Sequence, residues 1–138
     1  MNIEQVFEKL HGEVEGSAET SILYYSKKVI CNTLKGKGEI KTTYHETQMD
    51  PNKFTIWIVT EKTIEKFICD YPNMETLTIQ LKDIVEFQKE YELIGDSRPG
   101  KEPILKKITF TFNGKQEEIV RPEYYKAQKR YQEFGNNL

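Results

Sequence analysis

The alternation of apolar and polar residues along this chain is broken most clearly in the stretch FTIWIVTEK, at residues 54–62. A half-buried strand alternates apolar with polar side chains, because successive side chains point to opposite faces of the sheet. Here both sets are apolar, with Phe54, Ile56 and Ile58 on one side and Trp57 and Val59 on the other. The pattern therefore predicts a strand in a sheet that is covered on both faces.

The apolar spacing before residue 38 is that of a helix. Ile3, Val6, Phe7 and Leu10 fall at i, i+3, i+4 and i+7, which places them on one stripe of an amphipathic helix. Asn2 is a suitable N-cap for this helix. We expect residues 1–36 to form a helical extension in front of the strands.

Residues 17–36, SAETSILYYSKKVICNTLKG, fit either a helix or a pair of strands. As a helix the segment begins at an N-cap, Ser17, and ends before Gly36. The apolar stripe of this helix would be Ile22, Tyr25, Val29 and Thr33. As strands, ILYY and KVIC have the β-branched and aromatic content that sheets favour. The start and stop signals favour the helix.

From residue 38 onward the pattern changes to short strands separated by turn residues. Strands are predicted near 39–48, 53–60, 63–71 and 76–81, and again within 104–120, where Asn113-Gly114 is typical of a type I′ hairpin turn. Residues 83–93 fit a strand or a short helix. Residues 95–103 are rich in Gly, Pro and charge, which predicts a loop.

The last element, RPEYYKAQKRYQEFGNN, has the features of an amphipathic helix. Pro122 fits the first helical position and Gly135 the position just after the end. Its inward stripe would be Tyr124, Ala127, Tyr131 and Phe134.

Seven strands followed by a closing amphipathic helix resemble the pleckstrin-homology-like superfold of small bacterial proteins. The segments that carry the resemblance are KFTIWIVTEKTIEKFICDYP, TLTIQLKDIVEF, ITFTFNGKQEEIV and RPEYYKAQKRYQEF. It implies a mostly β, α+β fold: a seven-stranded antiparallel barrel closed by a C-terminal helix over residues 38–135, with residues 1–36 as an addition. We expect the 138 residues to form a single domain.

The resemblance also implies a function, and the residues restrict it. The best-known activity of the superfold is phosphoinositide binding by basic residues around the loop that joins the first two strands. Here that loop reads HETQMDPNKF and sets Lys53 beside Glu46 and Asp50, so it lacks the convergent positive charge that a phosphate needs. Many members of the superfold bind proteins instead, often in the groove beside the C-terminal helix.

Composition is that of a folded chain, with 37% hydrophobic and 12% aromatic residues. The net charge of −2 gives no electrostatic footprint for nucleic acid. Two cysteines, Cys31 and Cys69, are too few for a secreted disulfide framework and are expected as free, buried thiols. No apolar run suits a membrane span or a signal peptide, so a reducing cytoplasm is the expected compartment.

No catalytic or cofactor motif is present in the sequence. The two histidines, His11 and His45, have no partner at metal-ligand spacing, so we expect neither a metal site nor a cofactor. The GKG of residues 36–38 lacks the further glycines of a phosphate loop. These observations weigh against an enzyme without deciding the question.

Two basic surfaces are the candidate interaction sites. The first lies on the final helix and just before it, at Arg121, Lys126, Lys129 and Arg130. The second is the loop of residues 95–103, with Arg98 and Lys101. Each is either a solvated surface or a docking site for an acidic protein or an anionic surface.

The function expected from these features is that of a non-catalytic protein-interaction module, whose partner is another protein or a second copy of the chain. The alternative is a small-molecule binder or enzyme on a cone-shaped α+β sheet, similar to the nuclear-transport-factor-like superfold, which the leading helices favour. A deep central cavity would support that alternative.

Overall fold

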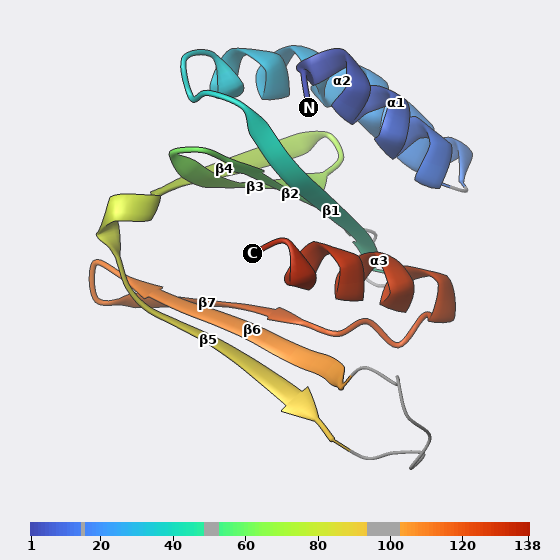
Figure 1. Cartoon of the computed structure of the whole chain (residues 1–138). Coiled ribbons are helices and arrows are strands. Elements are labelled where there is room, and N and C mark those ends of the chain that lie inside the picture. Colours follow the sequence, from blue (N-terminus) through green and yellow to red (C-terminus); the bar gives the residue numbers. More distant parts are fainter. Residues whose placement is uncertain (15, 49–52, 94–102) are drawn as a thin grey trace. The chain divides into compact units, whose positions relative to one another are not determined.

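Two helices lead into seven antiparallel strands and a third helix ends the chain in the computed structural model (Figure 1). The structure describes residues 1–14, 16–48, 53–93 and 103–138, and the counts of elements refer to these residues. They divide into two compact units, Met1–Leu81 and Lys82–Leu138. None of the described helices is long and apolar enough to span a membrane. The fold belongs to the α+β class.

Helix α1, Ile3–Glu13, forms as the sequence predicts. The Asn2 side chain accepts a hydrogen bond from the Gln5 backbone N–H at 2.8 Å, and the Gln5 side chain accepts one from the Asn2 N–H at 2.9 Å. This capping box satisfies two of the backbone donors that a helix leaves free at its start. Val6, Phe7 and Leu10 are buried, so the predicted apolar stripe is confirmed.

Helix α2, Ser17–Leu34, confirms the helical interpretation of that segment and excludes the strands. Its predicted inward stripe is wrong by one residue. The buried residues are Leu23, Ser26, Ile30 and Leu34, whereas Tyr25 is 66% and Val29 41% exposed. Both stripes have helical spacing and are largely apolar, so periodicity alone does not separate them.

The first unit has a four-stranded antiparallel sheet in the order β1-β2-β3-β4. Its strands are β1 Ile40–Gln48, β2 Lys53–Thr60, β3 Thr63–Asp70 and β4 Asn73–Gln80. Helices α1 and α2 lie on one face of it (Figure 1), where Phe54, Ile56, Ile58 and Phe67 join the buried residues of both helices in one apolar cluster. These helices therefore cover one face of the doubly apolar strand.

Strand β2 is buried along both of its faces. Residues 54–60 are all buried, including Trp57 on the side opposite Ile56 and Ile58. The Lys66 ammonium lies 4.9 Å from the centre of the Trp57 ring, a cation–π contact between neighbouring strands. The prediction that both faces are covered is confirmed.

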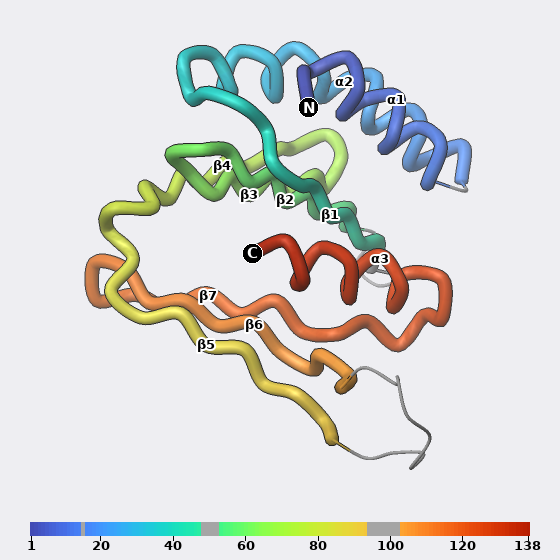
Figure 2. The backbone as a smooth tube through the Cα atoms, viewed as in Figure 1, coloured from blue at the N-terminus to red at the C-terminus, as the bar shows by residue number. Residues whose placement is uncertain are grey.

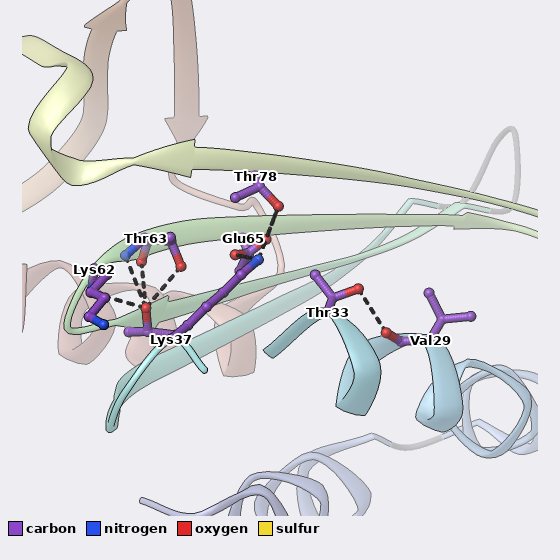
Figure 3. Close-up of polar contacts among 8 residues, drawn as sticks. Val29, Thr33, Lys37, Lys62, Thr63, Glu65 and Thr78 are labelled. Carbon is purple, nitrogen blue, oxygen red and sulfur yellow. Dashed lines mark hydrogen bonds and ion pairs between the residues drawn. The ribbon is translucent and has the colours of Figure 1, made fainter. Parts of the chain in front are cut away.

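A buried ion pair joins the α2–β1 connection to the sheet. The Lys37 ammonium contacts Glu65, whose side chain is fully buried, and the Thr78 hydroxyl donates to the same carboxylate at 2.6 Å (Figure 3). Two polar partners compensate the carboxylate for the water it loses on burial. Lys37 thereby fixes the end of α2 against strands β3 and β4.

The second unit begins with a short 3₁₀ helix, η1 Leu81–Asp83, whose first residue belongs to the first unit, and a three-stranded sheet in the order β5-β6-β7. The strands are β5 Ile84–Glu92, β6 Ile104–Phe112 and β7 Lys115–Val120. Asn113 and Gly114 both have positive φ, at 49° and 73°, as the predicted type I′ turn requires. Residues 84–92 form a strand, which resolves the open alternative in that region.

Helix α3, Tyr125–Asn136, lies on this sheet (Figure 2). Its buried residues Ala127, Tyr131 and Phe134 confirm most of the predicted stripe, but Tyr124 is 55% exposed. Pro122 precedes the helix and does not start it, and Gly135 lies inside the helix and not after it. A Cβ atom on Gly135 would come within 2.0 Å of a methyl group of Leu105 in β6, so this glycine permits the close approach of helix and strand.

The described strands do not make the closed seven-stranded barrel that we expected. They pair as four and three, and no strand pairing joins the two sheets within the described ranges. Closure needs a continuous ladder of backbone hydrogen bonds, whereas η1 separates the last strand of one sheet from the first strand of the other. The seven antiparallel strands and the C-terminal helix are confirmed.

Candidate anion-binding groove beside helix α3

A groove of about 480 Å³ lies between helix α3 and the segments that flank strands β6 and β7 in the second unit. Its lining combines cationic, amide and largely apolar side chains, namely Arg121, Lys126, Lys129, Gln128, Gln132, Pro103, Ile104 and Tyr125. Three of them carry positive charge and none of these described lining residues is acidic. The groove is thus a basic site on a chain whose net charge is −2.

Gln128 holds the segment before the helix in place. Its amide nitrogen donates to the backbone carbonyls of Pro122 at 3.0 Å and Glu123 at 3.2 Å. Its amide oxygen accepts a hydrogen bond from the Arg121 guanidinium at 3.0 Å. Because Gln128 is itself fixed by two backbone groups, the guanidinium is oriented before any ligand binds.

Gln132, one helical turn later, holds the segment at the start of β6 by hydrogen bonds to its backbone. Its oxygen accepts from the Leu105 backbone N–H at 2.9 Å and its nitrogen donates to the Pro103 carbonyl at 3.2 Å. These two bonds tie α3 to the start of β6 and satisfy backbone groups of Pro103 and Leu105. The walls of the groove are therefore held by hydrogen bonds on both sides.

The electrostatics of the groove suit an anion with an apolar part. A guanidinium presents several donors in a planar fork that fits a carboxylate or a phosphate, and lysine ammonium groups add positive charge around it. Pro103, Ile104 and Tyr125 provide largely apolar surface beside these groups. Positive charge along a partly apolar groove attracts anionic ligands and raises the rate at which they associate.

The structure brings together three of the six candidate residues predicted from the sequence. Arg121, Lys126 and Lys129 line the groove, whereas Arg130 is half-buried and is not among the lining residues. Arg98 and Lys101 lie outside the described residues. Residues 49–52, in the loop that the sequence predicts to lack a phosphoinositide site, also lie outside the described residues.

Sequence reasoning missed the two glutamines and Tyr125. Residues 125, 128, 129 and 132 have the spacing i, i+3, i+4 and i+7, so they form a second stripe along the helix, next to the apolar one. A search for polar stripes with this spacing would have found it. The contribution of Pro103 and Ile104 depends on tertiary packing, which the sequence pattern does not contain.

Comparison of the chain with protein-family models, with curated proteins and with solved structures gives no significant match.

The remaining candidate chemistry lies elsewhere. His11 is exposed at the end of α1, and His45 is buried with its ring centre 5.5 Å from that of Phe54. Both cysteines are free thiols: Cys31 is half-buried, and burial raises the pKa of Cys69 to about 11, which leaves its thiol unreactive at neutral pH. The described residues contain no cluster of three or more side chains suited to a metal ion.

A second, smaller pocket of about 230 Å³ lies between α2 and the β3–β4 hairpin of the first unit. Tyr25 and Tyr71 line it, with ring centres 6.2 Å apart, and both are more than half exposed. None of its described lining residues is charged. It offers apolar contact but no feature that selects a particular ligand.

Proposed function

We propose that the chain is a non-catalytic protein-interaction module that binds an acidic segment of a partner protein in the groove beside helix α3. The observation that carries the proposal is the convergence of Arg121, Lys126 and Lys129 on one groove, among whose described lining residues none is acidic. The largely apolar side of the groove favours a segment that alternates Asp or Glu with apolar residues over an inorganic anion.

The pleckstrin-homology-like resemblance is part of this proposal. A division of seven strands into four and three, followed by a C-terminal helix, supports it. The position of the groove beside that helix agrees with the protein-binding mode that the resemblance implies. The proposed compartment is the cytoplasm, where the two free thiols would stay reduced.

A binding experiment with a fluorescent peptide tests this function. The probe alternates Glu with Leu, and its anisotropy is measured against wild-type protein and a Lys126→Glu/Lys129→Glu variant. We expect the wild type to bind more weakly as salt rises. Two reversed charges should weaken binding about tenfold or more, which corresponds to about 1.4 kcal/mol or more.

The matched control is Lys106→Glu/Lys115→Glu. It makes the same change in net charge on two exposed lysines of the same unit that do not line the groove. We expect this control to bind nearly as well as the wild type. Equal losses in both variants would reveal a non-specific charge effect and would contradict the proposal, as would the absence of binding by the wild type. Binding to anionic vesicles but not to the peptide would favour a membrane-surface function instead.

A further inference from the structure

The two sheets present four edge strands, and three of them carry the protections that prevent edges from pairing with other chains. Such protections are bulges, charged side chains and short length. Strand β1 has a register shift near its start, β5 has two shifts and four charged residues, and β7 is six residues long with three charged residues. Strand β4 differs from all three. Its pairing with β3 is regular over eight residues and it holds one charged residue, Glu75.

The register of the β3–β4 hairpin shows which backbone groups face outward. The Leu81 N–H donates to the Lys62 carbonyl at 2.9 Å, and these two residues continue the register in which Thr63 lies opposite Gln80. In an antiparallel pair, hydrogen-bonded and non-hydrogen-bonded residue pairs alternate. Residues 73, 75, 77 and 79 therefore bond to β3, and residues 74, 76, 78 and 80 direct their N–H and C=O groups away from it.

This outer edge is exposed and held in a fixed position. Thr76, Thr78 and Gln80 are exposed, and among the described residues the sheet ends at β4. The hydrogen bond from Thr78 to Glu65 anchors the strand to its neighbour (Figure 3). A rigid and exposed edge can accept another strand at little cost in conformational entropy.

We propose that β4 pairs antiparallel with β4 of a second copy of this chain, about a two-fold axis at Leu77. In this register Thr76 lies opposite Thr78 and Met74 opposite Gln80, so all four outward-facing residues find backbone partners. Leu77 meets its own copy and Glu75 lies opposite Ile79, so no like charges face each other. Threonine pairs across strands contribute favourably to sheet stability.

Strand β5 carries more charged residues than β4, and some of its two-fold registers set like charges opposite each other. A two-fold pairing of β5 about Gln88 sets Glu86 opposite Glu90, and one about Lys89 sets Glu86 opposite Glu92. Like charges directly opposite each other destabilise a sheet. The choice of a second copy as the occupant of β4 rests on the two-fold register of that strand, which pairs all four outward-facing residues and sets no like charges opposite each other.

A strand-to-strand contact of eight residues buries little surface, so the dimer should be weak and its population should depend on concentration. Sedimentation velocity of the wild type over about two decades of concentration is the test. We expect a shift from monomer to dimer as the concentration rises. A wild type that stays monomeric over the whole range overturns the proposal.

The variant Thr76→Pro removes one outward-facing N–H and leaves the bonds to β3 in place, since proline is tolerated where the N–H of an edge strand faces solvent. Thr76→Val is the matched control, because it keeps the N–H and the β-branched shape. We expect dimer formation to be lost in the first and kept in the second. Undiminished dimer formation by a folded Thr76→Pro protein overturns the proposal.

Hydrogen exchange on the wild type decides the question if Thr76→Pro fails to fold. On dimer formation the amides of residues 74, 76, 78 and 80 should become protected, whereas those of 73, 75, 77 and 79 are already bonded within the hairpin. We expect protection of the first set to increase with concentration and that of the second to stay constant. Equal behaviour of the two sets overturns the proposal.

Discussion

Among single residues, Glu46 in β1 shows how burial and polar contacts compete. Burial raises the pKa of its carboxyl, while a hydrogen bond from the Tyr44 hydroxyl, at 3.3 Å, and the charge of Lys66 act in the opposite direction. Burial is the largest of these effects. The folded state therefore holds a proton on Glu46 more tightly than the unfolded state does.

This difference sets a pH dependence of stability. A raised pKa in the folded state contributes stability that is fully present below the unfolded pKa of about 4.5 and is lost as the pH rises through the folded pKa. Glu46→Gln removes the ionisation, so we expect a higher free energy of unfolding at pH 7 and a smaller loss between pH 4.5 and 7 than in the wild type. Urea denaturation at several pH values measures both quantities.

Glu75→Gln on the exposed strand β4 is the control for this substitution. It removes the same charge from a solvated position and should leave the pH dependence as it is in the wild type. A Glu46→Gln protein that is less stable than the wild type at pH 7 would show that Lys66 and Tyr44 stabilise the charged carboxylate more than burial disfavours it.

Among the elements, helix α3 depends on a glycine for its contact with the sheet. A Cβ at Gly135 would lie 2.0 Å from a Leu105 methyl group and 3.5 Å from one of Ile108, and both of these side chains are fully buried. We expect Gly135→Ala to destabilise the protein by about 1–3 kcal/mol, because the helix must shift or Leu105 must leave its rotamer. Thermal and urea denaturation measure this loss.

Gly12 provides the matched control, because it lies inside helix α1 and a Cβ there meets no atom within 4 Å. Gly12→Ala should stabilise the protein by up to about 1 kcal/mol through helix propensity alone. If both substitutions raised the stability, the close approach of α3 to β6 would not be a constraint on the fold.

Gly135 also shows where sequence signals reach their limit. A glycine near the end of a helical pattern is typical of the residue after the helix, yet here it is the packing partner of Leu105 inside the helix. Helix α2 shows the same limit. The predicted stripe, which begins at Ile22, and the buried stripe, which begins at Leu23, are one residue apart, and both have helical spacing. Local spacing predicts that a helix forms, and the choice of face depends on the sheet it meets.

At the scale of the whole molecule, the order of the elements was predictable because each strand and helix has its own period and its own turn residues. The division of the strands into four and three was not, since pairing partners far apart in sequence leave no local signal. Of the groove, the cationic residues were predictable from their clustering on the final helix and in the segment just before it. The roles of Gln128 and Gln132 depend on backbone groups of other segments.

The doubly apolar strand β2 leads to the last prediction, which concerns the role of residues 1–36. Helices α1 and α2 bury Phe54, Ile56, Ile58 and Phe67 on one face of the first sheet. Deleting residues 1–36 would expose this face, and contiguous apolar surface of this kind promotes association. We expect the truncated protein to aggregate and to bind a hydrophobic dye, as measured by light scattering and dye fluorescence.

Two double variants of the full chain test the contact between the helices and the sheet while both helices are kept. One variant changes buried positions of the helices and the other changes exposed positions. Val6→Asp/Leu23→Asp places two charges at fully buried positions, and Tyr24→Asp/Tyr25→Asp places two on the exposed side of α2. Burial of an unpaired charge costs several kcal/mol, so about that loss of stability, with aggregation, is expected for the first variant. The second variant should stay soluble and folded. A truncated protein that is soluble, monomeric and as stable as the full chain would contradict the assignment of these helices as the cover of the sheet.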